Sequence, residues 1–406
     1  LIDLVESGEV SLDRIDDAVT RVLRLKFYLN LFEKPYNDPG NFEDVGSDKH
    51  IEANYTMAAE SITLLKNTND VLPLQQGKKV FVTGYAANSM NVLNGAWSRS
   101  FLGRDTSYND PSKLTILDAI TQTVGAPYVS YLQGTDYESD INTAMAVKRA
   151  SQADYIVVCA GEIPATEVPS NTNELELPKV QQELIRKLSE TGKPIIVVLV
   201  QGRPRIIREI EPLADAVLMA YLPGQEGGRA VSDVIFGSVN PSGKLPYTYP
   251  KYAGFVLPYY HKKTDARDEN WGFDGFDPQY HFGQGLSYTT FEYSNVEINT
   301  DTLEGNGTLA ISVAVTNTGA MKGKEVVQCY ISDLVASIAP DTKRLVRFEK
   351  IELEPNETKT VRFEFNSNDL SFVGLENKWI VESGDFQVLI GGDPVNLKVK
   401  ELSYTK

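Results

Sequence analysis

Residues 51–250 alternate short apolar runs with amphipathic stretches. The runs are hydrophobic at nearly every position, as in strands of a parallel sheet that is covered on both faces. The stretches between them have helical spacing, so the pattern predicts an α/β domain with a doubly wound, mostly parallel sheet. The predicted strands are Val80–Thr83, Tyr128–Leu132, Tyr155–Cys159, Pro194–Val200 and Ala216–Ala220. The clearest predicted helices are Leu114–Thr123, Ile141–Ser151 and Lys179–Thr191.

The pattern changes after residue 283, where polar and apolar residues alternate in segments such as LAISVAVTNTG (309–319). Turn residues separate these segments and no helix is expected. Residues 284–406 are therefore predicted to form an all-β, fibronectin- or immunoglobulin-like sandwich without an intersheet disulfide. Residues 251–283 form a connector whose aromatic residues we expect to pack between domains rather than to contact substrate. These residues are Tyr259, Tyr260, Trp271, Phe273, Phe276 and Tyr280.

Residues 1–33 contain one predicted amphipathic helix, Ser11–Leu31, which places Leu12, Ile15 and Val19 on one face. Ser11 is the expected N-cap. A Pro- and Gly-containing linker (34–50) follows, and it offers nothing to cover the apolar face. We therefore expect the packing partner of this helix to precede Leu1, and the chain to begin within a longer fold.

Composition narrows the class of ligand. The chain has 39 Lys and Arg against 55 Asp and Glu, a formal net charge of −16. That balance argues against nucleic acid and anionic membranes as partners. Cys159 and Cys329 lie in apolar runs and are expected to be buried and unpaired. The three histidines are scattered singly, so we expect no metal site, and no motif indicates a cofactor.

Two loops are expected to leave the carboxyl edge of the sheet, where ligands bind in such folds. The loop after Tyr155–Cys159 carries Glu162, Glu167, Glu174 and Glu176; the loop after Val80–Thr83 carries Trp97 and Phe101. Neither loop matches a phosphate-binding pattern. Aromatic rings beside an acid suit a sugar, because rings stack on its C–H face and an acid can protonate a glycosidic oxygen. Taken alone, any of these glutamates could equally be a solvated surface group, and Trp97 could be a buried anchor.

Longer motifs sharpen this interpretation. They are SLDRIDDAVTRVLRLKFYLNLFE (11–33), AAESITLLKN (58–67), YLPGQEGGRAVSDVIFGSVNPSGKLPYTYP (221–250), FGQGLSYTTFEYSN (282–295), VTNTG (315–319) and EVVQCYISD (325–333). In this order they resemble the C-terminal portion of a glycoside hydrolase family 3 β-glucosidase. The resemblance implies a terminal (β/α)8-barrel helix (1–33), a linker (34–50), an α/β sandwich domain (51–250), a connector (251–283) and a fibronectin III-like domain (284–406).

The resemblance also assigns roles to individual residues. GEIPATE (161–167) is similar to the family pattern G-E-x-P-Y-T-E, which implies that Glu167 is the general acid/base. Ala165 replaces the usual Tyr, and Glu162 is expected to brace the loop. GAWSRSF (95–101) is similar to G-G-W-x-x-x-W, which implies that Phe101 is the sugar platform, with Trp97 behind it. The family's nucleophile is an Asp in an S-D-W-type motif on the barrel, and that motif does not occur in this chain.

The implied function is that of a retaining, exo-acting β-glucosidase that releases terminal nonreducing β-D-glucosyl residues from oligosaccharides or aryl and alkyl glycosides. This chain would supply the acid/base half of the site, and a (β/α)8 barrel on the same or another chain would supply the nucleophile. We expect the chain alone to be inactive. The alternatives are a β-xylosidase, an α-arabinofuranosidase or an N-acetylglucosaminidase of the same family, or a non-catalytic carbohydrate-binding scaffold; the G-E-x-P-x-T-E match argues mildly against the N-acetylglucosaminidases.

The cellular setting is inferred from weaker signals. Asn54, Asn306 and Asn356 open Asn-x-Thr sequons, and enzymes of this type are often exported. We expect a secreted or periplasmic protein rather than a cytoplasmic one. No apolar run is long enough to span a bilayer. A homo-oligomer is compatible with the sequence.

Overall fold

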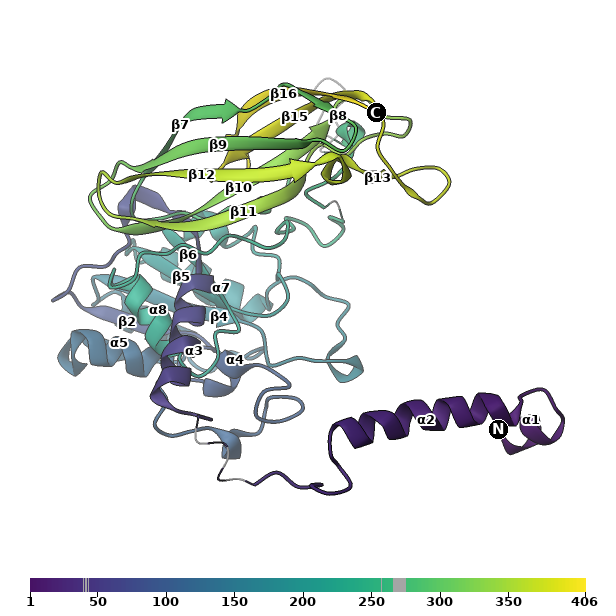
Figure 1. Cartoon of the computed structure of the whole chain (residues 1–406). Coiled ribbons are helices and arrows are strands. Elements are labelled where there is room, and N and C mark those ends of the chain that lie inside the picture. Colours follow the sequence, from purple (N-terminus) through teal and green to yellow (C-terminus); the bar gives the residue numbers. More distant parts are fainter. Residues whose placement is uncertain (39, 41, 43, 257, 266–274) are drawn as a thin grey trace. The chain divides into compact units, whose positions relative to one another are not determined.

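The computed structural model describes residues 1–406 except 39, 41, 43, 257 and 266–274 (Figure 1). The described chain divides into two compact units, Leu1–Ala53 and Asn54–Lys406. Helix α3 (Asp48–Ser61) runs from the first unit into the second. Each unit is described by itself.

The first unit contains the short helix α1 (Ile2–Glu6) and the amphipathic helix α2 (Leu12–Tyr28). The Ser11 side chain accepts a hydrogen bond from the backbone N–H of Arg14 at 3.2 Å, so the predicted helix and its N-cap are confirmed. No residue of α2 is buried, and apolar side chains such as Leu12 and Val22 are exposed. The apolar face that the sequence predicted is therefore not covered within this unit.

The second unit begins with a six-stranded sheet of order β1-β6-β5-β4-β2-β3. The strands are β1 (Thr63–Asn67), β2 (Val80–Thr83), β3 (Val129–Tyr131), β4 (Tyr155–Gly161), β5 (Ile195–Val200) and β6 (Ala216–Tyr221). All neighbouring pairs are parallel except β1 with β6, which is antiparallel. The five predicted strands are confirmed to within two residues at each end. The edge strand β1 was not predicted as a strand.

Helices cover both faces of this sheet (Figure 1). They are the end of α3 and the helices α4 (Met90–Asn94), α5 (Ile116–Val124), α6 (Thr143–Ala150), α7 (Lys179–Ser189) and α8 (Gly227–Ile235). Alternate residues of β4 show the two layers. Val157 and Cys159 pack in the core that also contains α3, α4, α5 and α8, whereas Ile156 and Val158 pack against α6 and α7. This two-sided burial explains why the strands are apolar throughout. Cys159 is buried and free, as expected, and so is Cys329 in the next domain.

Residues 291–405 form the predicted β-sandwich. One sheet has the order β11-β10-β15-β16-β8 and the other β12-β9-β7. The strands are β7 (Phe291–Ile298), β8 (Thr302–Glu304), β9 (Thr308–Asn317), β10 (Gly323–Asp333), β11 (Arg344–Leu353), β12 (Thr358–Asn366), β15 (Gly384–Gly391) and β16 (Lys398–Thr405). A separate hairpin pairs β13 (Phe372–Val373) with β14 (Trp379–Ile380). The expectation of no helix was wrong at one turn, a 3₁₀ helix at Ser367–Leu370, where Asn366 and Asp369 form a capping box.

The connector packs through several of its aromatic rings. Tyr259 stacks on Phe282 with ring centroids 4.1 Å apart, and Tyr280 lies edge-on to Tyr249 at 5.9 Å. Phe276 stacks on His261. Tyr280 thus contacts the α/β domain, and Tyr259 also lies 6.4 Å from Tyr330 of β10, in agreement with the expected packing between domains. Phe276 contacts another connector residue, and Tyr260 is 48% exposed and only partly packed. Two other predicted packing residues lie outside the described residues: Trp271 and Phe273.

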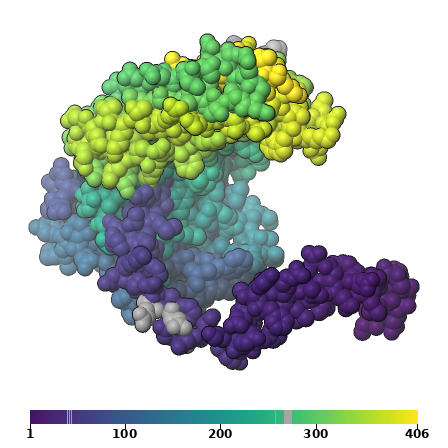
Figure 2. All heavy atoms as spheres, in the orientation of Figure 1, coloured from purple at the N-terminus to yellow at the C-terminus, as the bar shows by residue number. Residues whose placement is uncertain are grey.

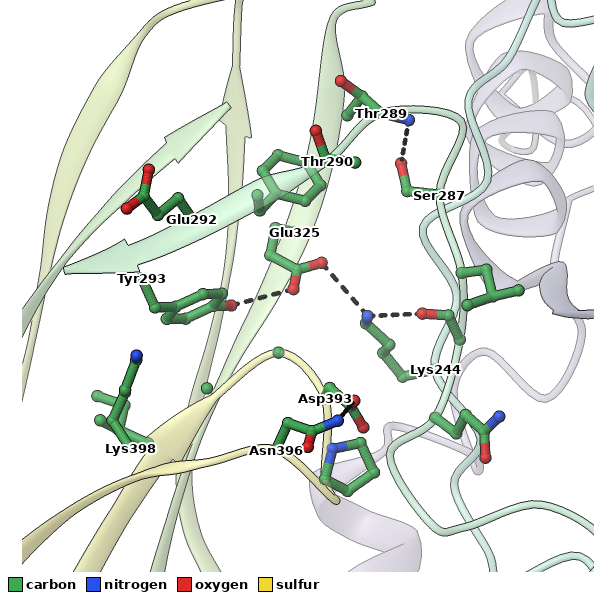
Figure 3. A pocket seen from close by; sticks show the side chains of 18 residues that line it. Lys244, Ser287, Thr289, Thr290, Glu292, Tyr293, Glu325, Asp393, Asn396 and Lys398 are labelled. Atoms are coloured by element: carbon green, nitrogen blue, oxygen red, sulfur yellow. Dashed lines mark hydrogen bonds and ion pairs between the residues drawn. The ribbon is translucent and has the colours of Figure 1, made fainter. Parts of the chain in front are cut away.

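Ion pairs join the sandwich to the α/β region, and Figure 2 shows the two sets of atoms in contact. Glu325 of β10 lies 3.3 Å from the ammonium of Lys244 and accepts a hydrogen bond from the Tyr293 hydroxyl at 3.0 Å. Figure 3 shows Lys244 and Tyr293 pointing toward the Glu325 carboxylate from different segments. Glu60 of α3 pairs with Lys324 and Lys350 at a more exposed place on the same junction. These contacts pack the sandwich directly against the α/β region.

Candidate functional site

The acidic loop (residues 162–176) begins where β4 ends at Gly161. Gly161 has φ +150°, and a Cβ atom there would lie 1.9 Å from the Val200 carbonyl oxygen of β5. Only glycine permits this close approach. The Glu162 N–H donates to the same carbonyl oxygen at 3.0 Å. The first glutamate of the loop is therefore fixed to the sheet.

Glu162 is buried between two arginines from the loop that follows β5. Its side chain is 3% exposed, and its Oε1 atom accepts hydrogen bonds from Arg203 Nε at 2.6 Å and from Arg205 Nε at 3.0 Å. Arg203 also donates to the Ser170 carbonyl at 2.8 Å, and Arg205 to the Glu174 carbonyl at 2.7 Å. The two arginines thus join the start of the acidic loop to its far end. The prediction that Glu162 braces the loop is confirmed.

The structure separates the four glutamates of the loop. Glu162 is committed to the two arginines, Glu174 accepts the backbone N–H of Glu176, and Glu176 lies 3.8 Å from Arg208. The Glu167 carboxylate alone has no hydrogen bond or ion pair within the described part of the chain. It is exposed and lies at the rim of a hollow of about 300 Å³. Among these four acids, Glu167 is the one that is free to act on a ligand.

Backbone strain marks the same place. Nine described non-glycine residues have positive φ, and six of them are Asn or Asp, which tolerate this region. The other three are Trp97 (φ 55°), Glu167 (φ 52°) and Tyr221 (φ 55°). Each lies in a loop, or at a strand end, at the carboxyl edge of the sheet. Such strain is commonly found at functional sites, where the surrounding structure holds it in place.

The aromatic loop (residues 95–103) follows α4, a helix in a segment that was predicted to be a loop. The Trp97 N–H donates to the Phe101 carbonyl at 3.1 Å and closes a tight turn. Trp97 is 67% exposed and Phe101 is 52% exposed. The turn leaves both rings at the surface, and the expected order of Trp97 behind Phe101 relative to a sugar stays a prediction. Both rings are available as platforms for a ligand.

Two residues that the sequence did not single out join the loops. Arg104 Nε donates to the Pro164 carbonyl of the acidic loop at 3.3 Å. Leu222, directly after β6, lines the hollow beside Glu167, and a Cβ atom at Gly95 would lie 2.7 Å from its Cδ1 atom. The sequence could have indicated both residues only through their positions after predicted strands. Strands β6, β5, β4 and β2 are neighbours, and the segments that follow them start at one edge of the sheet.

The strain at Glu167 predicts a gain in stability when its side chain is removed. With φ 52° and ψ −165°, this backbone conformation favours glycine and costs other residues about 1–3 kcal/mol. Glu167→Gly should raise the free energy of unfolding by about 1 kcal/mol, measured by urea unfolding, after the flexibility of glycine in the unfolded chain is subtracted. Glu174→Gly, at a residue without positive φ, is the matched control and should lower the free energy of unfolding. Equal losses for both variants would show that Glu167 is not strained.

Other features of the described residues do not compete with this site. No group of three or more His, Cys, Asp or Glu in the described part is placed to hold a metal ion. None of the helices found there is long and apolar enough to cross a membrane. The hollow of about 640 Å³ in Figure 3 contains Lys244 and Glu325, but these groups neutralise each other at the domain junction.

Comparison with known proteins gives matches along most of the chain. Residues 62–288 match the family model of the glycosyl hydrolase family 3 C-terminal domain, and residues 325–393 match the fibronectin type III-like domain. A lysosomal beta glucosidase of Dictyostelium discoideum is 37% identical over 419 residues, which cover 98% of this chain and 50% of the relative. A beta-xylosidase of Formosa agariphila is 34% identical over 415 residues, covering 100% of this chain and 57% of the relative.

A solved structure extends the comparison to the fold. A mutant of the beta-glucosidase of Listeria innocua, crystallised with laminaribiose, superposes with a TM-score of 0.90 at 29% identity. The match covers 100% of this chain and 57% of that one. The chain spans about half the length of the curated relatives that it matches.

Proposed function

This chain belongs to glycoside hydrolase family 3, and we propose that it supplies the acid/base half of the active site of a retaining, exo-acting β-glycosidase. Glu167 is the proposed general acid/base. Trp97 and Phe101 are the proposed platforms for the leaving-group sugar. The nucleophile is an Asp of a (β/α)8 barrel, on the same or another chain.

The observation that carries this proposal is the separation of the four glutamates. Three are engaged by arginines or by the backbone, whereas Glu167 is free and lies on a strained backbone beside an open hollow. The exposed rings of Trp97 and Phe101 lie in the segment that follows β2, the strand next to β4. Arg104 joins this segment to the acidic loop by a hydrogen bond. An acid next to flat apolar rings fits a glycoside, whose oxygen needs a proton and whose C–H face stacks on rings.

The reaction proceeds in two steps. In the first, the barrel Asp attacks the anomeric carbon while Glu167 gives its proton to the glycosidic oxygen, so the C–O bond breaks and a glycosyl-enzyme forms. In the second, Glu167 takes a proton from water, and the resulting hydroxide equivalent displaces the barrel Asp. The configuration at the anomeric carbon is retained because it is inverted twice.

Retention sets the geometry that the complete site must reach. The two carboxyl groups must lie about 5–5.5 Å apart. An acid that gives up its proton near neutral pH also needs shielding from water or a nearby negative charge. Glu167 is exposed in this chain, so the barrel would provide both the shielding and the charge.

Terminal nonreducing β-D-glucosyl residues are the proposed substrate, in oligosaccharides or in aryl and alkyl glycosides. A β-xylosidase is the second candidate, because one relative is named as such. The sugar at the nonreducing end is held by the barrel, so the 406 residues do not distinguish the two. The ratio of kcat/KM for aryl β-glucoside and aryl β-xyloside, measured on the complete enzyme, decides between them.

A compartment outside the cytosol is the proposed location, either secreted or periplasmic. Two observations support a place outside the cytosol: the Dictyostelium relative is a lysosomal enzyme, and the chain carries three Asn-x-Thr sequons, at 54, 306 and 356.

We predict that the purified 406-residue chain does not hydrolyse p-nitrophenyl β-D-glucoside, because the nucleophile is missing. Circular dichroism and a cooperative melt should first show that the chain is folded. Fusing a family 3 barrel domain before Leu1 should produce turnover, and the same fusion with Glu167→Gln is its control. Turnover by the folded chain alone would refute the half-site proposal, and a fusion that binds glycan without turnover would favour the scaffold alternative.

A further inference from the structure

A second hollow, of about 440 Å³, lies at one end of the β-sandwich. We call it the hairpin hollow, because the β13–β14 hairpin forms one of its walls. The connector and the end of β10 form the others. The side chains that matter for a ligand are Tyr260, Asp333, Asp341, Arg344, Phe372 and Trp379. Its volume is within the range of small-molecule sites, and it shares no residue with the hollow at Glu167.

The hairpin hollow presents two exposed aromatic rings. Trp379 is 69% exposed and Tyr260 is 48% exposed. The Tyr260 ring lies perpendicular to Tyr259 (interplanar angle 88°), with the centroids 5.3 Å apart. Tyr259 is itself stacked on Phe282, and its hydroxyl accepts the Leu345 N–H at 3.2 Å. Tyr260 is therefore oriented by a fixed neighbour and needs no reorganisation to receive a flat ligand.

The charges that line the hollow sum to zero, because two cations (Lys262, Arg344) stand against two carboxylates (Asp333, Asp341). Lys262 lies 2.6 Å from Asp341 and pairs with it. Arg344 uses its guanidinium N–H groups on two backbone carbonyl oxygens. The lining therefore has no net charge to attract an ionic ligand, and it fits a neutral molecule.

Two polar atoms are nevertheless available. Asp333 Oδ1 accepts the Val335 N–H at 3.1 Å, whereas its Oδ2 atom has no partner among the described residues. The Tyr260 hydroxyl has none there either. Burial raises the pKa of Asp333, because its carboxylate has lost part of its contact with water. A carboxylate oxygen and a phenol hydroxyl beside flat rings match the hydroxyl groups and the C–H face of a sugar.

We propose that the hairpin hollow is a second carbohydrate-binding site, which holds sugar units of a neutral glycan without cleaving them. Trp379 and Tyr260 stack on the sugar rings, and Asp333 accepts a hydrogen bond from a hydroxyl group. The choice of a β-linked glycan as the ligand rests on the proposed function; the existence of the site does not. Such a site keeps a polysaccharide near the enzyme between cleavage events.

Affinity electrophoresis of the 406-residue chain tests the proposal, with laminarin or hydroxyethylcellulose in the gel. The chain should be retarded by at least one of these glucans. Trp379→Ala should weaken binding about tenfold, as expected for the loss of one stacked ring and its buried area, and Asp333→Asn should weaken it less. Phe348→Ala is the matched control, because Phe348 is 67% exposed on β11 of the same sandwich but outside the hollow.

Two further variants separate this site from the proposed active site. In a chain that already carries Trp97→Ala and Phe101→Ala, Trp379→Ala should cause the same fold loss of glucan binding, so failure of the proposed function does not decide this test. Thermal melting of each variant shows whether it is folded. No retardation of the unaltered chain, or equal weakening by Phe348→Ala and Trp379→Ala, would overturn the proposal. A change in sedimentation coefficient with Trp379→Ala, without a change in glucan binding, would assign the hollow to contact between two copies instead.

Discussion

Replacing Glu167 by Gln in the complete enzyme should lower kcat/KM about 10²–10⁴-fold for glucosides with poor leaving groups, the usual contribution of a general acid. A poor leaving group needs a proton as the C–O bond breaks, and an amide cannot give one. 2,4-Dinitrophenolate is a good leaving group that departs without a proton. The glycosylation step with 2,4-dinitrophenyl glucoside should therefore be almost unaffected. Initial rates across a series of aryl glucosides measure the contrast as a steeper dependence on leaving-group pKa.

The control for this series is Glu174→Gln. Glu174 lies in the same loop and is exposed, but its carboxylate contacts only the backbone of Glu176. It should give unchanged rates with every leaving group. If Glu167→Gln also behaves like the unaltered enzyme, Glu167 is the wrong glutamate.

Replacing Glu162 by Gln should cost about 3–5 kcal/mol of the free energy of unfolding of the α/β domain, the largest loss in stability that we expect for a single change in the loop. The substitution leaves the buried Arg205, which also hydrogen-bonds the Tyr137 hydroxyl, without a compensating charge. Arg203 loses the same partner. Urea unfolding of the 406-residue chain measures the change.

Glu174→Gln again serves as the control and should stay within about 0.5 kcal/mol. Glu162 and Glu167 should therefore respond to substitution in opposite ways. Glu162→Gln should damage stability strongly, and activity only through displacement of the loop, whereas Glu167→Gln should damage activity without loss of stability. A stable Glu162→Gln variant with abolished proton transfer would exchange the two roles.

The apolar pattern predicted the parallel strands because their side chains are buried on both faces. Val80–Thr83 begins and ends as expected. The edge strand β1 was missed because only part of TLLKN is buried, and because it pairs antiparallel with a strand more than 140 residues later. Its pairing depends on tertiary contacts, which local patterning does not contain.

The candidate site was predictable only in part. Spacing alone could not rank four glutamates in one loop, because they differ only in the groups that hydrogen-bond or ion-pair with each carboxylate. Arg203 and Arg205 follow Glu162 by 41 and 43 residues and come from another strand's loop. The family resemblance pointed to Glu167, and the structure supports that proposal with a carboxylate that has no partner among the described residues and a strained backbone. The positive φ of Trp97 and the position of Leu222 were not visible in the sequence at all.

The most direct test of the central claim is the product that the complete enzyme with Glu167→Ala forms from 2,4-dinitrophenyl β-D-glucoside in the presence of azide. This substrate forms the glycosyl-enzyme without help from a general acid. Azide needs no general base, so it can enter the space of the removed Glu167 side chain and attack the glycosyl-enzyme. We predict faster turnover with azide and β-glucosyl azide as the product, identified by its anomeric proton coupling in NMR. An α-glucosyl azide, or no azide adduct and no rate increase, would contradict Glu167 as the acid/base of a retaining enzyme.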